Sequence, residues 1–214
     1  RFFQEGVSNA TQDKLERAGI RCYVQGGSRI NDQTDLVVVS TAVEDTVPEV
    51  QKAKQLGIPI IRRSELLAII AASKKTIAVG GTSGKSTTSA MLFDILRYAG
   101  MQPSIISGAG LISLMKDGAI GNAFTGRGEW LVIEADESDG SIVQYKPEIG
   151  LLLNVDKDHK ELDVLMEVFS VFKNNSRQFV VNQSHPLAAR LSQDPAHDFS
   201  VNGGGGYVAT DFVQ

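Results

Sequence analysis

The feature that most constrains the fold of this chain is a glycine-rich turn between a strand-like run and a helical run. Residues 76–79 are β-prone, and the stretch from residue 86 to about residue 99 has helical character. The turn reads V-G-G-T-S-G-K over residues 79–85. Glycines let the backbone turn tightly and direct several N–H groups at one anion, and the following helix adds its positive end. The sequence therefore predicts a strand–turn–helix unit that binds a phosphate group.

This turn meets only the second half of the general phosphate-loop pattern, G-x-x-x-x-G-K-[ST]. Its first glycine would be residue 79, which is Val79, so the loop is a shorter variant. Lys85 supplies a charge for phosphate oxygens, and the Ser86 hydroxyl can bind Mg²⁺. The alternative is a glycine-rich turn beside a chance lysine. The residues expected to bind the phosphates of a nucleoside triphosphate are Gly81, Thr82, Ser83, Gly84, Lys85, Ser86 and Thr87.

Composition narrows the class of protein. The 214 residues, 42% of them hydrophobic, suit one large or two modest globular domains. Lys and Arg total 21 against 25 Asp and Glu, and this net charge of −4 argues against nucleic-acid binding. The single cysteine, Cys22, allows no intrachain disulfide and favours a reducing compartment, so we expect a cytoplasmic protein. The apolar stretch at residues 58–72 is interrupted by charges at residues 62–65, so no membrane insertion is expected.

Strand-like and helical runs alternate along the chain, which predicts an α/β protein with parallel sheets. A polar stretch at residues 73–75 separates two such alternations, and we place a domain boundary there. The first domain is then residues 1–74 and the second is residues 75–214. The phosphate loop falls at the first strand–helix turn of the second domain, where open α/β sheets bind ligands.

An acidic cluster follows the apolar run at residues 130–133. The string E-A-D-E-S-D at residues 134–139 carries four carboxylates, which repel one another unless they are solvated or bind a cation. A solvated surface loop is the alternative interpretation. A strand end in the domain that carries the phosphate loop favours Mg²⁺. Glu134 lies nearest the strand end and is the first choice of ligand.

A histidine follows another apolar strand, in N-V-D-K-D-H at residues 154–159. His159 is expected at the same sheet edge as Lys85 and Glu134. A lone histidine is more often structural than catalytic, and Mg²⁺ prefers oxygen, although imidazole also binds metals. His185 and His197 stand beside prolines in apparent turns and are assigned no role.

Together, the strings at residues 81–87, 134–139 and 154–159 resemble the Mur ligase family of ATP-dependent amide-bond-forming enzymes. Within the family, E-A-D-E-S-D is most similar to the members that add L-alanine to UDP-N-acetylmuramate. The first domain has further matching runs in the family's order, at residues 37–43, 48–49, 57–60 and 63–67.

The resemblance implies a Rossmann-like, UDP-substrate-binding domain at residues 1–74 and a central P-loop-type ATPase domain at residues 75–214. Both are expected to be incomplete, with a glycine-rich loop preceding Arg1 and a C-terminal ligase domain following Gln214. The implied activity belongs to peptidoglycan precursor synthesis. ATP phosphorylates the carboxylate of UDP-N-acetylmuramate, and the amine of L-alanine then displaces phosphate to form an amide.

The resemblance also implies residue roles. Lys85, Glu134 and His159 are the expected catalytic residues. Ser86 and Glu134 would bind one Mg²⁺, and His159 a second. Weaker candidates for the UDP site are Ser40, Thr41 and Ala42, for which an ordinary capped turn is the alternative.

Two other functions stay open at this stage. One is a recycling ligase that joins a murein peptide to the same nucleotide sugar, because Ser83 stands where the alanine-adding members usually have histidine. The other is a nucleotide-binding module without ligase activity. Amino-acid- and peptide-dependent release of phosphate would separate these alternatives.

Overall fold

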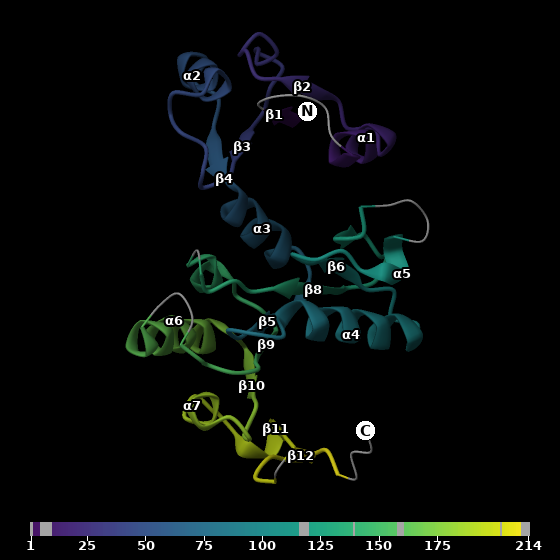
Figure 1. The fold of residues 1–214 in the computed structure, drawn as a ribbon, viewed down its shortest axis with the longest axis vertical. Helices are drawn as coiled ribbons and strands as arrows, with labels where there is room; N and C mark the ends of the chain where they lie inside the picture. Colours follow the sequence, from purple (N-terminus) through teal and green to yellow (C-terminus); the bar gives the residue numbers. More distant parts are fainter. Residues whose placement is uncertain are drawn as a thin grey trace. The chain divides into compact units, whose positions relative to one another are not determined.

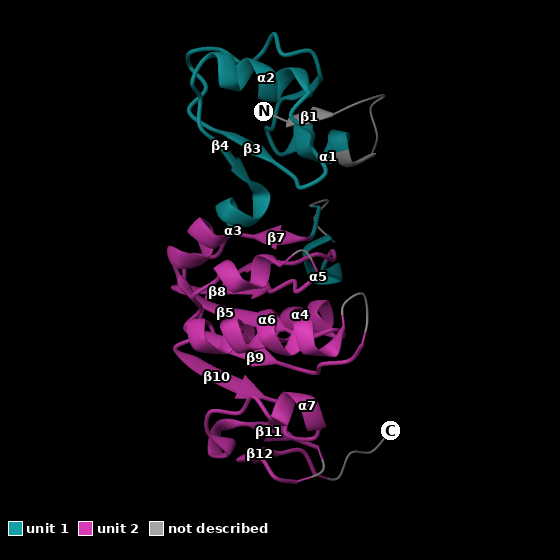
Figure 2. Cartoon of the chain, turned by 90° about the vertical axis from the view of Figure 1, so that its left-hand side faces the viewer, with its two compact units in different colours: residues 1–67, 111–121 teal, residues 68–110, 122–214 magenta. Residues whose placement is uncertain are grey.

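The computed structural model describes residues 2–4, 10–115, 120–138, 140–157, 161–201 and 203–210. The chain divides into two compact units (Figure 2), one of residues 1–67 and 111–121 and the other of residues 68–110 and 122–214. The division falls within a helix, a few residues before the boundary expected at residues 73–75. The assignment of the units to two functional domains stays a prediction.

Unit 1 contains short strands that pair in parallel, as two separate two-stranded sheets, β1 with β2 and β3 with β4. Its elements are β1 (Phe2–Gln4), α1 (Ala10–Arg17), β2 (Cys22–Val24), β3 (Val37–Val39), α2 (Pro48–Gln55), β4 (Ile60–Arg62), the start of α3 (Arg63–Ala72) and α5 (Ile112–Met115). The buried Glu49 in α2 accepts the backbone N–H groups of Gly26 and Gly27, each at 2.8 Å. This carboxylate therefore fixes the turn that follows β2.

Unit 2 is built on a six-stranded sheet in the order β10-β9-β5-β8-β6-β7. Figure 1 labels the strands of this sheet from β10 to β6. Its strands are β5 (Lys75–Gly80), β6 (Ser104–Ile106), β7 (Ala123–Phe124), β8 (Trp130–Glu134), β9 (Ile149–Leu152) and β10 (Gln178–Val181). All neighbours are parallel except β6 and β7. The predicted fold class, α/β with a mostly parallel sheet, is confirmed.

Helices and a small strand pair complete unit 2. They are α4 (Lys85–Tyr98), η1 (Ser141–Gln144), α6 (Leu162–Asn175), α7 (Pro186–Ala189), η2 (Pro195–His197) and the parallel pair β11 (Phe199–Ser200) and β12 (Tyr207–Val208). Helix α6 turns an apolar face into the core, because Leu165, Phe169 and Phe172 are buried. Phe172 makes an edge-to-face contact with Phe179 of β10, with ring centroids 5.5 Å apart. No helix in the described part of the chain has the length and apolar character needed to cross a bilayer.

The central strands explain where a site can form. Five of the six residues of β5 are buried, and its neighbour β8 buries Leu131, Val132 and Ile133. Such continuous burial is typical of parallel strands with both faces covered. In the register of the sheet, Val79 pairs with Glu134 and Gly80 pairs with Leu152. The carboxyl ends of β5, β8 and β9 therefore meet at one edge.

Candidate nucleotide-binding site

The phosphate loop connects the end of β5 to the start of α4. Gly81 and Gly84 have φ angles of +142° and +80°, a region that L side chains rarely adopt. A Cβ atom on Gly81 would lie 3.2 Å from the Cβ of Leu153 and 3.3 Å from the backbone nitrogen of Asn154. The loop therefore lies directly against the segment that follows β9, and glycine permits this approach. Gly84 is the N-cap of α4 and has no side-chain cap, which leaves the first N–H groups of the helix for an anion.

Lys85 folds back over the loop that precedes it. Its Nζ donates to the carbonyl oxygen of Gly81 at 2.7 Å and to the two carboxylate oxygens of Glu137 at 2.9 and 3.3 Å. The side chains of Lys85 and Glu137 are only 17% and 5% exposed. Because little water screens this pair, the attraction between its charges is stronger than in a surface ion pair. The ammonium group is thus held beside the loop that is expected to bind phosphate.

Glu134 is the meeting point of three elements. Its carboxylate accepts the Ser86 hydroxyl at 3.0 Å, from the start of α4. It also accepts the backbone N–H of Gly108 at 2.9 Å and the hydroxyl of Ser107, both from the segment after β6. The structure therefore brings together Ser86 and Glu134, the two side chains expected to bind the first Mg²⁺. Sequence reasoning missed Ser107, which follows a strand too short to predict.

These oxygen donors fit Mg²⁺ in number and kind. No three His, Cys, Asp or Glu side chains gather as a metal cluster among the residues that the structure describes. Mg²⁺ is commonly bound by one or two protein side chains, with substrate phosphates and water as its other ligands. The hydroxyl of Ser86 and the carboxylate of Glu134 would supply such a pair. Their role as metal ligands stays a prediction.

Other predicted site residues are not brought to this cluster. His159 lies outside the described residues, so the second metal site stays a prediction. Ser40, Thr41 and Ala42 belong to unit 1, where they are exposed after β3, and the Ser40 carbonyl accepts the N–H of Val43 at 3.2 Å. This is a hydrogen-bonded turn, and its assignment to a UDP site also stays a prediction.

Asn154 contacts the phosphate loop, and sequence reasoning gave it no role of its own. Its Oδ1 accepts the hydroxyl of Thr82 and the N–H of Ser83, both at 2.9 Å, and its Nδ2 donates to the Ser83 carbonyl at 3.1 Å. The Thr82 hydroxyl in turn accepts the N–H of Asp156 at 3.0 Å. The sequence signal was present, because Asn154 follows a predicted strand at the same edge as the loop.

His185, to which the sequence assigned no role, contacts the segment that follows β9. Its Nε2 lies 3.2 Å from Oδ1 of Asp156, and its Nδ1 accepts the N–H of Ala188 at 3.4 Å, which caps α7. A neutral ring with its proton on Nε2 satisfies both contacts, because Nδ1 must accept. His185 follows the end of β10, so this strand also delivers a polar side chain to the loop-bearing edge.

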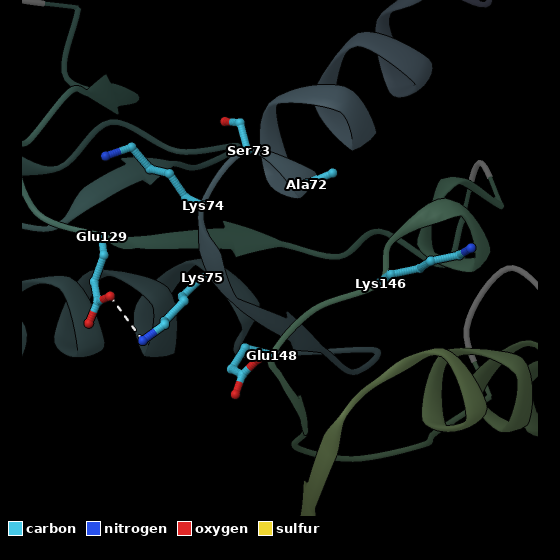
Figure 3. Close-up of a pocket in the computed structure, with 7 residues that line it drawn as sticks. All are labelled: Ala72, Ser73, Lys74, Lys75, Glu129, Lys146 and Glu148. Carbon is cyan, nitrogen blue, oxygen red and sulfur yellow. Dashed lines mark ion pairs between the residues drawn. The ribbon is translucent and has the colours of Figure 1, made fainter.

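A cavity of about 560 Å³ lies at the amino-terminal ends of the strands, opposite the phosphate loop (Figure 3). The residues that line it precede β5, β8 and β9 or stand at the start of β5. They are Ala72, Ser73, Lys74, Lys75, Glu129, Lys146 and Glu148. Its carboxylates are already paired, Glu129 with Lys75 at 2.9 Å and Glu148 with Arg177 at 2.6 Å. Open α/β sheets bind ligands at the carboxyl ends of their strands, so the loop edge is the stronger candidate.

This fold and this loop define the class, an α/β protein with a phosphate loop at the carboxyl edge of a mostly parallel sheet. Residues 5–75 match the family described as "Mur ligase family, catalytic domain", and the phosphate loop follows soon after the matched residues. The chain is 41% identical over 168 residues to the UDP-N-acetylmuramate–L-alanine ligase of Synechococcus sp. (strain RCC307), covering 76% of the chain and 34% of that protein. The chain belongs to the Mur ligase family.

A second relative agrees with the first. The UDP-N-acetylmuramate–L-alanine ligase of Aquifex aeolicus (strain VF5) is 38% identical over 190 residues, covering 86% of the chain and 41% of that protein. The chain thus spans only about a third to two fifths of the length of these curated relatives.

Solved structures of the family share the fold. The UDP-N-acetylmuramate-alanine ligase of Thermotoga maritima superposes with a TM-score of 0.78 at 24% identity, covering 94% of this chain and 47% of that one. The UDP-N-acetylmuramate:L-alanyl-gamma-D-glutamyl-meso-diaminopimelate ligase of Neisseria meningitides gives 0.75 at 23% identity, covering 88% and 65%. The Thermotoga maritima MurF ligase in complex with ADP gives 0.53 at 21% identity, covering 84% and 50%. At these identities the likeness concerns the fold alone.

Proposed function

We propose that the full-length protein is an ATP-dependent ligase of peptidoglycan precursor synthesis that joins L-alanine to UDP-N-acetylmuramate. The observation that carries this proposal is the meeting of Lys85 with the Ser86–Glu134 pair at one sheet edge. The relatives that are 38–41% identical carry the name of this activity, which supports the choice of substrates. The single cysteine and the use of ATP support a cytoplasmic location, and the proposed reaction serves cell wall biogenesis, cell shape and cell division.

The geometry supports a reaction in two transfers. Backbone N–H groups of the loop and of the start of α4 would hold the phosphates, and Lys85 would neutralise charge on the γ-phosphate as it passes to the substrate carboxylate. The bond between the β- and γ-phosphates breaks, ADP leaves, and an acyl phosphate forms. The amine of L-alanine then attacks the acyl carbon, loses a proton and expels phosphate.

Positioning and charge neutralisation carry most of the work in phosphoryl transfer. Ser86 and Glu134 would hold Mg²⁺, which when bound screens the charges of the phosphates and of the substrate carboxylate. For this role Glu134 must keep its orientation, and the hydrogen bonds from Ser107 and Gly108 provide it. Lys85 keeps its orientation through Gly81 and Glu137.

A peptide-recycling ligase is the second candidate, favoured by Ser83 at the loop position where the alanine-adding members usually have histidine. The same nucleotide sugar and ATP would react, with a murein tripeptide in place of L-alanine. The residues at the described edge serve both reactions equally, because they act on the phosphates and the carboxylate.

The test is release of phosphate by the full-length protein from ATP, Mg²⁺ and UDP-N-acetylmuramate with a panel of amino acids and the tripeptide. We expect release that depends on L-alanine, with the amide product identified by mass spectrometry. Lys85→Ala should abolish it, whereas Glu129→Gln at the opposite edge should retain it. ATP binding that Lys85→Ala abolishes, without any amide product, would identify a nucleotide-binding module instead.

A further inference from the structure

We propose that Asn154 and Thr82 clamp the phosphate loop in its nucleotide-binding conformation, which makes them positioning residues for ATP. This inference rests on the nucleotide site of the proposed function. It concerns a contact between the phosphate loop and the segment after β9. The two contacting residues, Thr82 and Asn154, are 72 residues apart in the sequence. We name the four hydrogen bonds that join Thr82 and Ser83 to Asn154 and Asp156 the loop clamp.

The amide of Asn154 binds both polar backbone groups of Ser83. Its Oδ1 accepts the Ser83 N–H, and its Nδ2 donates to the Ser83 carbonyl. Two bonds to one residue define the orientation of that residue, as one bond cannot. The Ser83 carbonyl is thereby occupied, which matters because a phosphate loop must present N–H groups rather than carbonyl oxygens to its anion.

The same bonds sharpen the prediction for the loop. Because Asn154 occupies the Ser83 N–H, the backbone donors that remain for phosphate on the helix side of Ser83 are those of Gly84 to Thr87. These residues form the uncapped start of α4. Ser83 therefore serves the clamp, and its exposed side chain is free to differ between family members without loss of the phosphate site.

Thr82 completes the loop clamp, because its hydroxyl is both a hydrogen-bond donor and an acceptor. It donates to Asn154 Oδ1 at 2.9 Å and accepts the N–H of Asp156 at 3.0 Å. A serine at this position would keep both bonds, and a valine of similar shape would lose both. Gly81 adds to the contact, because its φ of +142° lets the loop pass close to Leu153. The loop therefore takes its shape from the end of β9 as well as from β5 and α4.

The test compares ATP binding and steady-state kinetics of the full-length protein carrying Thr82→Val, Thr82→Ser, Asn154→Ala or Thr82→Val/Asn154→Ala. Thr82→Val removes two bonds of the clamp and Asn154→Ala removes three. We expect each variant to raise the Kd and the KM for ATP roughly tenfold, because the loop loses its positioning contacts. The KM values for the other substrates should stay within about twofold. Thr82→Ser should bind ATP like the wild type.

The double variant tests whether the two residues act together. Because they share one network, the loss in the double variant should be smaller than the sum of the two single losses. A Kd for ATP that is unchanged in Asn154→Ala and Thr82→Val, with only a lower melting temperature, would overturn the proposal. Equal losses in Thr82→Ser and Thr82→Val would overturn it as well.

ATP binding also separates this inference from the proposed reaction. A protein that binds ATP but releases no phosphate with any acceptor would refute the ligase function, and the clamp would still be decided by the Kd values. If Asn154→Ala fails to fold, the pair Thr82→Ser and Thr82→Val decides the question alone. Glu129→Gln, outside both the loop and the clamp, is the control for unspecific effects.

Discussion

At the scale of single residues, the pair of Lys85 and Glu137 couples ligand binding to stability. Lys85→Met removes the cation beside a carboxylate that is 5% exposed. We expect loss of ATP binding together with a decrease of about 3 kcal/mol in the free energy of unfolding, because the buried Glu137 carboxylate loses the ammonium group that compensates its charge. The double variant Lys85→Met/Glu137→Gln should regain most of that stability and still not bind ATP. Chemical denaturation and calorimetric titration measure the two effects, and a fully stable Lys85→Met protein would contradict this account.

Glu134 gives the second prediction at this scale. In Glu134→Gln the amide oxygen can take the place of Oε1 and accept from Ser107 and Gly108, while the amide NH2 faces the oxygen of Ser86 and can donate to it, so the melting temperature should change little. The negative charge is lost, and we expect kcat to fall by about 100-fold or more, with a higher Mg²⁺ concentration at half-maximal rate. The measurement is phosphate release across a Mg²⁺ titration. Glu129→Gln is the matched control, and an unchanged Mg²⁺ dependence in Glu134→Gln would exclude Glu134 as the ligand.

The sequence indicated part of this cluster and not the rest, for a physical reason. Lys85 and Ser86 stand in a local motif, and Glu134 ends a strongly apolar strand, so each could be found without knowledge of the sheet. Asn154 and His185 acquire their contacts only through the strand order and register, which place the ends of β9 and β10 beside those of β5 and β8. A polar residue after a strand indicates that its side chain lies near the carboxyl ends of the strands, but not which residue it will contact there.

At the scale of elements, the turn between β5 and α4 depends on Gly81. Gly81→Ala would place a Cβ 3.2 Å from Leu153 and strain a φ of +142°. We expect the loop to move, so that the Kd for ATP rises by tenfold or more. Gly100→Ala is the control, because its φ of +75° is strained but no atom lies within 4 Å of the new Cβ. It should cost about 1 kcal/mol of stability and leave ATP binding unchanged. Equal Kd values for the two variants would contradict the close approach.

Element η2 carries a pH-dependent cap. The N–H of Ala196 and, next, the side chain of His197 lower the pKa of Asp194. A carboxyl group whose pKa is lowered by folding stabilises the protein above its unfolded pKa of about 3.9, and this contribution disappears as the pH falls through the folded pKa. Asp194→Ala should therefore have a lower denaturation midpoint at pH 7, and the difference from the wild type should shrink toward pH 3. A difference that is independent of pH would contradict this cap.

The long apolar runs were predictable as elements, and the short ones were not. β5 and β8 have buried runs that dominate their local sequence, and the spacing of Leu165, Phe169 and Phe172 indicates one helix face. β6 and β7 have three and two residues, too few for a periodicity. Their pairing is a property of the assembled sheet, since β7 adds antiparallel to β6 at its edge.

At the scale of the whole molecule, the nucleotide site belongs to unit 2 alone. The phosphate loop and the start of α4 contact Glu134 at the end of β8 and Asn154 after β9. Glu134 in turn contacts the segment after β6, and Asp156 contacts His185 after β10, all within that unit. The candidate UDP residues at positions 40–42 lie in unit 1. The alternation of strands and helices indicated a division in this region, and the structure divides the chain within α3. The exact position could not be predicted, because a helix that continues across the division shows no change of composition there.

This separation predicts that the two substrates protect different parts of the chain from hydrogen exchange. Binding free energy stabilises the unit that holds the ligand, by about 2.7 kcal/mol at a concentration of 100 Kd. ATP with Mg²⁺ should slow exchange in the full-length protein at residues 80–88 and 153–157, and UDP-N-acetylmuramate should slow it at residues 37–43. Lys85→Ala should lose the first effect and keep the second, because its substitution leaves unit 1 unchanged. Protection by UDP-N-acetylmuramate confined to unit 2 would show that the assignment of unit 1 to the nucleotide sugar is wrong.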